Sequence, residues 1–451
     1  MPIRFTNTLT GRKEDFLPLK PPQVTMYVCG VTVYDDCHIG HARGAVVFDT
    51  LRRFLEASGL KVRHIRNVTD VDDKIIDRAR KEGGDDLKAG ARAVAERYTG
   101  RFQADFARLG LLPPSAEPKA TEFIPKMIRF IEGLIREGVA YPGSDGVYFA
   151  VRELARRRGK YGDLSRQKLD QMMENAHVDA GAGKKDPLDF ALWKKAKPEE
   201  PSWPSPWGEG RPGWHIECTT MSTDLLGDEF DIHGGGQDLV FPHHENELAQ
   251  ALGAGKPFAK IWLHNGLLTV NGQKMSKSLG NFVTIEEALK KHPADVLRMF
   301  FLSAHYRSPM DFTWERLDEA ARAYERWTGF IAHEKAKGSG APAADSYIGE
   351  TGKNFFDAME DDLNTPEALA CLHGLAGHPG GSGKLLELGR LLGFFQSAEK
   401  TDPAVEKLIT ERDEARRKKD FTTSDRIRKQ LAEMGYVVED TTGKTVVRER
   451  V

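Results

Sequence analysis

The feature that most constrains the fold of this chain is a strand–helix–strand pattern near its N-terminus. Residues 24–33, VTMYVCGVTV, are rich in β-branched side chains and predict a buried strand. Apolar residues then recur at spacings of three and four between Ala45 and Leu55, which is typical of an amphipathic helix. Residues 61–68, KVRHIRNV, predict a second strand. Strands joined by a single helix run parallel, so we expect an α/β fold built on a parallel sheet.

Length and composition narrow the class of protein further. A chain of 451 residues exceeds one compact core and predicts about two to four domains. It has neither the roughly 18 consecutive apolar residues of a membrane helix nor an apolar secretory signal, so we expect a cytoplasmic protein with no membrane partner. Four cysteines are too few for a disulfide scaffold and favour metal ligands or nucleophiles. The net charge of −2 means that a polyanion site requires local clustering of basic residues.

Composition also predicts how the domains are arranged. A polar, proline-rich stretch ends near residue 210, and we interpret it as an insertion between two halves of one domain. The shift to this polar composition begins near Arg152. Sheet-like sequence resumes at residues 230–233, and a helical pattern runs on from about residue 317.

A candidate phosphate site lies where the first strand passes into the first helix, at Cys37-His38-Ile39-Gly40-His41. Unpaired backbone N–H groups and the helix dipole favour an anion at such a position. The two imidazoles could donate hydrogen bonds to phosphate oxygens, and Gly40 would let a nucleotide approach the backbone closely. Two surface or capping histidines are the alternative interpretation.

A second phosphate candidate is the string KMSKS at residues 274–278, between Gly272 and Gly280. Two ammonium groups with interleaved hydroxyls suit a polyphosphate leaving group. A solvated lysine–serine loop is the alternative. The occurrence of this string together with the two upstream histidines favours a nucleotide site.

The glycine-rich segment His233-Gly234-Gly235-Gly236-Gln237-Asp238 follows a predicted strand. Its glycines would let a ligand lie against the backbone, and Asp238 could bind a ribose hydroxyl. A tight turn without a ligand is the alternative.

A candidate metal site lies in residues 242–247, PHHENE, which predict the start of a helix with proline near its first position. His243 and Glu247 would share one helix face, a spacing that either holds one metal ion or makes a surface hydrogen bond. The candidate sulfur ligands lie elsewhere in the chain: Cys218, and either Cys29 or Cys37, between which spacing does not decide.

With these residues assembled, the sequence resembles the cysteinyl-tRNA synthetases, a family of class I aminoacyl-tRNA synthetases, over essentially its whole length. The family's HIGH and KMSKS signatures correspond to residues 38–41 and 274–278. Stretches more specific to the family are MYVCGVTVYDDCHIGH at 26–41, RNVTDVDDKI at 66–75, RPGWHIEC at 211–218 and FDIHGGGQDLVFPHHENE at 230–247. One departure is Thr219-Thr220-Met221, where the family often has Ser-Ala-Met.

The resemblance implies a Rossmann-type catalytic domain whose first half is 1–120, an inserted connective region at 121–205, a Rossmann second half with the zinc and adenosine sites at 206–262, a stem-contact region with the KMSKS loop at 263–318, a helical bundle at 319–398 and an anticodon-binding module at 399–451.

The resemblance also implies a role for each matching residue. One zinc ion per chain would be held by Cys29, Cys218, His243 and Glu247. The substrate cysteine would contact Gly30, Thr32, Thr69, Trp214 and His233. ATP, with Mg²⁺, would contact His38, Gly40, His41, Gly236, Asp238 and Lys277. The catalytic residues would be His38, His41, Lys274 and Lys277.

The resemblance also implies a two-step reaction. The carboxylate of L-cysteine would attack the α-phosphorus of ATP, and the terminal ribose of tRNA(Cys) would then accept the activated cysteine. Positioning and electrostatics carry such a reaction, so no side-chain nucleophile is needed. Zinc would select the cysteine thiolate, because an apolar pocket separates cysteine from serine by only about 1–3 kcal/mol. Four protein ligands normally close a structural zinc site, so the substrate sulfur would enter as a fifth ligand, or the site is structural.

Two other functions are considered beside this one. A cysteine:amino-sugar ligase of mycothiol biosynthesis resembles the catalytic half of the family, and a catalytically silent relative would only bind RNA or zinc. Intact HIGH and KMSKS signatures disfavour the silent relative. The C-terminal region resembles an anticodon-binding module, with four basic residues at 416–419, and the amino-sugar ligase is expected to lack it. We therefore expect tRNA(Cys), ATP and L-cysteine as partners of a monomer.

Overall fold

A computed structural model describes most of the chain. The described residues are 2–159, 161–169, 172, 183–276, 280–337, 345–396, 403–418, 420–434, 436–441 and 444–449. Lys277, predicted to contact ATP, lies outside these residues, as does Lys419 of the basic C-terminal cluster.

The centre of the molecule is a parallel four-stranded sheet. Its strands are β3 (Gln23–Thr32), β4 (Lys61–Thr69), β9 (Glu229–Gly236) and β10 (Phe258–Asn265), in the spatial order β10-β9-β3-β4. Each neighbouring pair is parallel, which confirms the predicted parallel sheet. The chain moves from β3 to β4 on one side and later to β9 on the other. Ligands of such sheets bind outside the carboxyl ends of the strands at this reversal of order, here β3 and β9.

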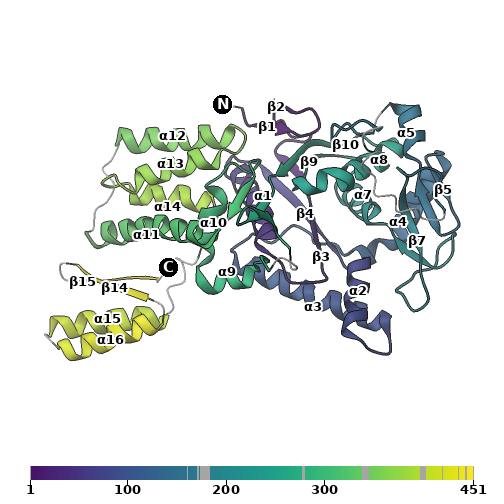
Figure 1. Cartoon of the computed structure of the whole chain (residues 1–451). Helices are drawn as coiled ribbons and strands as arrows, with labels where there is room; N and C mark the ends of the chain where they lie inside the picture. Colours follow the sequence, from purple (N-terminus) through teal and green to yellow (C-terminus); the bar gives the residue numbers. More distant parts are fainter. Residues whose placement is uncertain are drawn as a thin grey trace.

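The helix between the first two strands is α1 (Ile39–Ala57), and its apolar stripe explains why it covers the sheet (Figure 1). Val46, Leu51 and Phe54 on that stripe are almost completely buried. Burial of each such side chain contributes about 1.5–3 kcal/mol. Gly59 follows the helix with a φ of 84°, the left-handed conformation that ends many helices. The predicted strand–helix–strand unit is therefore confirmed.

The insertion contains more regular structure than its composition predicts. After η1 (Ala120–Phe123) and α4 (Ile124–Arg136), it forms an antiparallel sheet of β5 (Ala140–Pro142), β6 (Gly146–Phe149), β7 (Phe190–Lys195) and β8 (Gly210–Pro212), with α5 (Val151–Arg158) after β6. The sequence analysis predicted no strand at β7, which lies in the polar stretch before residue 210. Leu192 and Trp193 of this strand are fully buried, so tertiary packing stabilises it within a polar stretch. The sheet continues past residue 205, where the sequence placed the end of the insertion.

Further helices and a small sheet surround the central sheet. The hairpin of α2 (Asp73–Glu82) and α3 (Leu87–Arg108) follows β4, while α7 (Trp214–Leu226) and α8 (Glu245–Gly253) flank β9. The small sheet has the order β12 (Gln273–Lys274), β11 (Leu268–Val270), β13 (Met310–Phe312). The short helices α9 (Ile285–Lys291) and α10 (Ala294–Leu302) lie between its last two strands in sequence. The hairpin of β1 (Arg4–Asn7) and β2 (Arg12–Asp15) precedes all of these elements.

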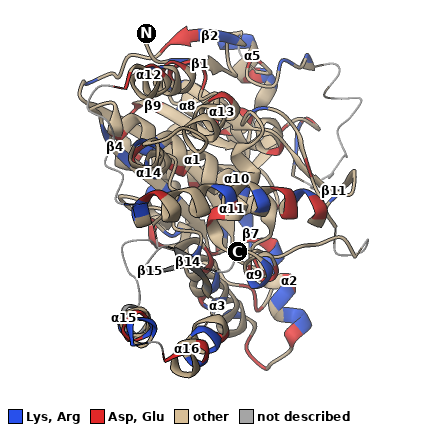
Figure 2. Ribbon diagram, turned by 90° about the vertical axis from the view of Figure 1, so that its left-hand side faces the viewer, with Lys and Arg blue, Asp and Glu red and all other residues tan. Residues whose placement is uncertain are grey.

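The C-terminal part is helical, as predicted. A bundle of α11 (Trp314–Lys337), α12 (Ser346–Glu360), α13 (Thr365–Leu375) and α14 (Ser382–Leu391) lies beside α10 (Figure 1). A separate module contains α15 (Pro403–Arg417), α16 (Phe421–Glu433), β14 (Tyr436–Thr441) and β15 (Lys444–Glu449). Both signs of charge occur along α11 and α15 (Figure 2). Among the described helices, none has the length and apolar character needed to cross a membrane.

Candidate active site and metal cluster

Four predicted metal ligands from four separate elements meet at the carboxyl end of the sheet. Cys29 lies near the end of β3, Cys218 in α7, His243 just before α8 and Glu247 within α8. One ligand atom from each lies within 4.8 Å of the others. Glu247 Oε1 is 3.1 Å from His243 Nε2 and 3.4 Å from Cys29 Sγ. Cys37, the alternative sulfur ligand, is buried outside this group.

The helix that carries Glu247 begins with Pro242 at its start, as predicted. Residues 240–244 form a wide, π-helical turn with one non-helical residue, and the turn continues directly into α8, which starts at Glu245. Phe241 in this turn has non-helical dihedral angles, and the Phe241–Pro242 peptide bond is cis. His243 lies four residues before Glu247 in this helical run, so the predicted pair on one helix face is confirmed.

The same turn adds a histidine that the sequence analysis missed. His244 Nε2 lies 3.3 Å from Cys29 Sγ. His244, Cys29, His233 and Glu247 form a second group of converging donor atoms that overlaps the first. His233 Nε2 lies 2.9 Å from Glu247 Oε2. The available signal was the position of His244 three residues before Glu247, a spacing that places both side chains on one side of a helix.

His215 is a second residue that sequence reasoning did not single out. Its Nδ1 lies 3.0 Å from His243 Nδ1, so one ring donates and the other accepts. Trp214 stacks on the other side of His243, with ring centroids 4.3 Å apart. Contacts to the outer nitrogen of a metal-binding histidine fix its orientation. His215 and Trp214 therefore hold His243 in place toward Glu247.

The electrostatics of the group favour a bound cation. Burial, and after it the neighbouring Cys218, raises the pKa of the Cys29 thiol well above its ordinary value. Burial likewise raises the pKa of Glu247. Among the described residues, the ion-pair partners of Glu247 are histidines, and burial lowers the pKa of His243 and His244. A divalent cation in the group would lower the raised pKa values of the thiol and the carboxyl group, because it stabilises thiolate and carboxylate. It would also bind the neutral imidazoles.

The residues predicted to contact the substrate cysteine surround this group. Gly30 and Thr32 lie at the end of β3, and the Gly30 N–H donates to Asn67 Oδ1 at 2.8 Å. A Cβ atom at Gly30 would lie 1.8 Å from the Asn67 carbonyl oxygen, so only glycine fits. Thr69 ends β4, and its hydroxyl donates to the buried Glu217 at 3.0 Å. Trp214 is 38% exposed, whereas His233 is fully buried beneath Glu247.

The sequence left two interpretations of the HIGH segment open, phosphate-binding histidines or capping histidines, and the structure is compatible with both at once. His38 is the N-cap of α1, and its Nδ1 accepts the N–H groups of Gly40 at 3.1 Å and His41 at 3.3 Å. The His38 N–H in turn donates to His41 Nδ1 at 3.2 Å. The expectation of unpaired N–H groups is therefore wrong, because these donors are used within the cap. The space beside Gly40 is also filled by the His38 ring, which a Cβ atom would meet at 2.9 Å.

This cap fixes the tautomers of both histidines. Burial lowers the pKa of His38 to about 4 and that of His41 well below its ordinary value, so both rings are neutral near pH 7. Since each Nδ1 accepts a backbone N–H, the single proton of each ring is on Nε2. The rings stack with centroids 3.7 Å apart. They therefore offer two parallel N–H donors, which suits an anionic group.

The second signature is held close to the first. The Ile39 N–H donates to the Val283 carbonyl at 3.1 Å, and the Ile285 N–H donates to the Cys37 carbonyl at 3.0 Å. Phe282 meets the His38 ring edge-on. The segment that follows the KMSKS string thus pairs with the start of the HIGH segment, although more than 240 residues separate them in sequence. Lys274 lies exposed on β12, at the start of this loop.

A buried arginine anchors the helix of the first signature. Arg43 of α1 is fully buried, and its guanidinium donates to the carbonyls of Gly266 at 2.9 Å and Leu267 at 2.8 Å. It also donates to the carbonyls of Tyr306 and Ser308. These carbonyls lie on the strand connections that lead into and out of the KMSKS region. No residue pattern indicates this role, because all four acceptors are main-chain atoms.

The predicted ribose site lies at the end of β9. Gly236 is the last residue of the strand, and Asp238 lies exposed in the short η2 (Gln237–Leu239). A Cβ atom at Gly236 would lie 2.4 Å from Asp238 Oδ1, so this glycine lets the carboxylate fold back over the strand end. The position matches the edge of the sheet at which His38 and His41 lie.

The chain matches three protein-family models and is similar to proteins of known family over almost its whole length. The model described as "tRNA synthetases class I (C) catalytic domain" matches residues 15–322. A "Cysteinyl-tRNA ligase anticodon binding domain" model matches residues 398–448, and a "DALR domain" model matches residues 354–378. The chain is 47% identical to the cysteine–tRNA ligase of Geobacter metallireducens over 98% of both chains. It is 48% identical to that of Thioalkalivibrio sulfidiphilus over 99% of both.

Solved structures show the same fold at much lower identity. Methionyl-tRNA synthetase of Mycobacterium tuberculosis, in complex with methionyl-adenylate, matches 82% of this chain and 84% of its own. The TM-score is 0.61 and the identity 15%. A LeuRS of Agrobacterium radiobacter matches 84% of each chain with a TM-score of 0.61 and 13% identity. The predicted α/β class with a helical C-terminal part is thereby confirmed.

Proposed function

This chain belongs to the cysteine–tRNA ligase family of class I synthetases, and we propose that its crevice at the carboxyl ends of β3 and β9 activates L-cysteine with ATP and transfers it to tRNA(Cys). The observation that carries this proposal is the meeting of three features at one sheet edge. These are the candidate metal ligands Cys29, Cys218, His243 and Glu247, the paired histidines of the HIGH segment, and the segment after the KMSKS string that pairs with the HIGH segment. The amino-sugar ligase is not favoured, because the anticodon-binding model matches the C-terminal module.

We assign the first step to the neutral histidine donors and to two lysine side chains. The Nε2 protons of His38 and His41 would hold the α-phosphate oxygens as the cysteine carboxylate attacks. Lys274 and Lys277 would neutralise the pyrophosphate as it leaves, together with Mg²⁺. Asp238, beside Gly236, would hold the ribose. Donors already fixed by a helix cap need no reorganisation during reaction, which is the main source of such catalysis.

The donor set at Cys29 fits zinc. Two sulfurs, one imidazole nitrogen and one carboxylate oxygen within 4.8 Å of one another form a common zinc ligand set. Cys29, Cys218, His243 and Glu247 would hold the ion, with His215 orienting His243. When bound, zinc would favour a thiolate over an alcohol and so distinguish cysteine from serine. Thr69 and Trp214, at the border of the group, would position the amino acid.

The remaining expectations follow from the same family. The α15–α16 module would contact the anticodon, and region 263–318 the inner side of the tRNA stem. We propose a cytoplasmic monomer whose insertion occupies residues 121–205 between two sheet halves, 1–120 and 206–262. A bundle at 319–398 would then connect these to the anticodon module at 399–451.

Replacing one sulfur ligand tests the zinc assignment. Cys218→Ser should lose bound zinc, measured by atomic emission of the purified protein, and cysteine-dependent ATP–pyrophosphate exchange together. Cys371→Ser is the matched control, because Cys371 lies in α13, away from the group. It should retain both. A zinc-free Cys218→Ser protein with normal exchange would contradict the assignment.

A further inference from the structure

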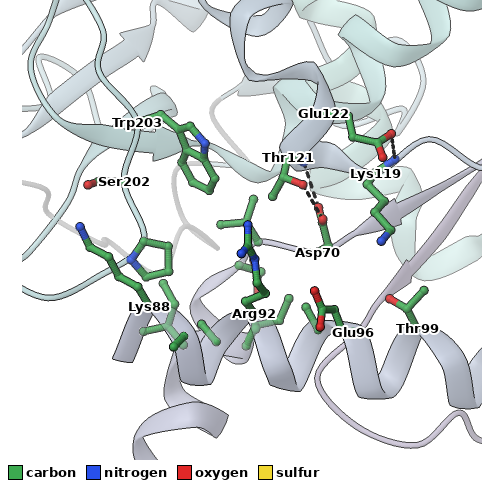
Figure 3. Close-up of a pocket in the computed structure, with 18 of the residues that line it drawn as sticks. Asp70, Lys88, Arg92, Glu96, Thr99, Lys119, Thr121, Glu122, Ser202 and Trp203 are labelled. Atoms are coloured by element: carbon green, nitrogen blue, oxygen red, sulfur yellow. Dashed lines mark hydrogen bonds between the residues drawn. The ribbon is translucent and has the colours of Figure 1, made fainter. Parts of the chain in front are cut away.

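A cavity of about 710 Å³ lies beside the active site, outside the residues assigned above. Its walls are the α2–α3 hairpin, the end of β4 with η1, and residues 201–203 of the insertion (Figure 3). Asp70, on its wall, directly follows Thr69 of the predicted cysteine site. The cavity therefore opens at the same edge of the sheet as the reaction centre, on the side of β4.

Most carboxylates around the cavity are already engaged. Asp70 accepts the Thr121 N–H at 2.9 Å and its hydroxyl at 2.6 Å. Asp72 caps α2, and Asp86 caps α3. Glu122 accepts the Lys119 N–H at 3.3 Å. Backbone donors at helix N-termini stabilise negative charge of this kind, so these carboxylates keep their charge but accept their hydrogen bonds from backbone and hydroxyl groups rather than from the basic side chains.

The basic side chains around the cavity have no ion-pair partner among the described residues. They are Lys88, Arg92 and Lys119. Lys88 and Arg92 follow one face of α3 at a spacing of four, so both reach the same wall. Glu96 continues that face as an exposed carboxylate, which can accept hydrogen bonds from hydroxyl or amino groups.

An aromatic ring completes the wall opposite α3. The indole of Trp203 points into the cavity, toward Arg92 (Figure 3). Its backbone exchanges two hydrogen bonds with Gly210: the Trp203 N–H donates to the Gly210 carbonyl at 2.8 Å, and the Gly210 N–H donates to the Trp203 carbonyl at 3.1 Å. Trp203 is therefore fixed at the sheet of the insertion while part of its ring remains accessible. A fixed aromatic face beside unpaired cations is the arrangement that binds unpaired nucleotides.

The position of the cavity indicates which nucleotide it would receive. In Figure 1 and Figure 2, α2 and α3 lie on the same lower side of the molecule as α15 and α16. An RNA that contacts the C-terminal module and delivers its terminal ribose to the active site would run along this side. Its single-stranded end would then pass the cavity before reaching the β3–β9 crevice.

We propose that this cavity binds an unpaired nucleotide of the tRNA acceptor end. Trp203 stacks on the base, Lys88, Arg92 and Lys119 neutralise the flanking phosphates, and Glu96 accepts a hydrogen bond from a ribose hydroxyl or a base amine. This role rests on the proposed tRNA ligase function and adds a binding site for the substrate RNA. A free nucleotide has the same chemistry, so the test has to separate RNA from ATP.

The test compares two reactions of the full-length protein. Trp203→Ala should lower kcat/KM for tRNA in aminoacylation by roughly 5- to 150-fold, the range measured for loss of one base stack. Trp203→Phe should restore most of it. Lys88→Ala with Arg92→Ala should reduce the slope of log kcat/KM for tRNA against log salt by about 1 to 1.5, as expected for two phosphate contacts on a single strand. ATP–pyrophosphate exchange, with its KM for ATP, should change less than about twofold.

Arg97→Ala is the matched control for charge, because Arg97 lies on α3 but pairs with Glu82 away from the cavity. It should leave the salt slope unchanged. Equal losses in exchange and aminoacylation, or a raised KM for ATP, would overturn the proposal in favour of a free-nucleotide site. Unchanged kcat/KM for tRNA in all cavity variants with normal exchange would overturn the proposal alone. Absence of cysteine-dependent exchange in the unaltered protein would overturn the proposed function as well.

Discussion

Replacing His38 by asparagine separates its two structural roles. In the structure, Nδ1 caps α1 through Gly40 and His41, while the proton on Nε2 is free to meet a phosphate oxygen. The Oδ1 of asparagine occupies nearly the position of Nδ1, and asparagine is among the best N-cap residues. No atom of asparagine reaches the position of Nε2. His38→Asn therefore keeps the cap and removes the donor, whereas His38→Ala removes both.

The two variants have different expected magnitudes. Loss of one preorganised donor to the charge of the transition state costs about 2.7–4 kcal/mol, or 10²- to 10³-fold in kcat. His38→Asn should show this loss in ATP–pyrophosphate exchange with almost unchanged stability. His38→Ala should show at least the same kinetic loss and, in addition, a destabilisation of about 1 kcal/mol from the missing cap.

Steady-state exchange kinetics and urea unfolding, followed by fluorescence, measure both quantities on the same samples. The variants should separate in stability but not in kcat. An exchange rate for His38→Asn within threefold of the unaltered protein would refute the reasoning, because the histidine would then act only as a cap. Equal stability of the two variants would refute the capping role instead.

Two other residues give predictions of different kinds. Arg43→Met should lower the free energy of unfolding by about 3 kcal/mol or more in urea titrations, because it leaves buried carbonyls of residues 266, 267 and 308 without a donor; a loss below 1 kcal/mol would contradict this anchor. His64 on β4 has its pKa lowered to about 3, mainly by burial and then by Arg66 and Arg52. The unfolded chain takes up this proton below pH 6.5 but the native protein does not, so stability should fall as the pH decreases from 6.5 toward 3, by about 2 kcal/mol at pH 5. His64→Leu should flatten this part of the stability curve measured by urea unfolding, and an unchanged slope would contradict the assignment.

Local pattern was sufficient for much of the fold and for the identity of the signatures. Strand β3, helix α1 and strand β4 follow from a run of β-branched residues and from apolar residues at helical spacing, all within residues 24–68. β7 was missed, because its six residues lie in a polar stretch and are stabilised by contacts with β6 and β8. The start of a helix at Pro242 was predicted correctly, but the wide turn over residues 240–244 was not, because no local pattern indicated it.

The candidate site shows the same division. Spacing could pair His243 with Glu247, but only the family resemblance chose Cys29 over Cys37, and only the structure places Cys29 Sγ near Glu247. His215 and His244 were identified only from their contacts with His243 and Cys29 in the structure. The periodicity of a sequence does not predict such contacts.

The amino-acid sequence by itself thus determined the parallel sheet, the two nucleotide signatures and the candidate ligands. Each of these was recognised from a short motif of neighbouring residues. The tertiary structure alone decided which ligands converge, how the His38 cap sets its tautomer, and that a tryptophan of the insertion faces the cations of α3. Those features depend on contacts between residues far apart in the chain, and such contacts exist only once the sheet has brought its strand ends to a common edge.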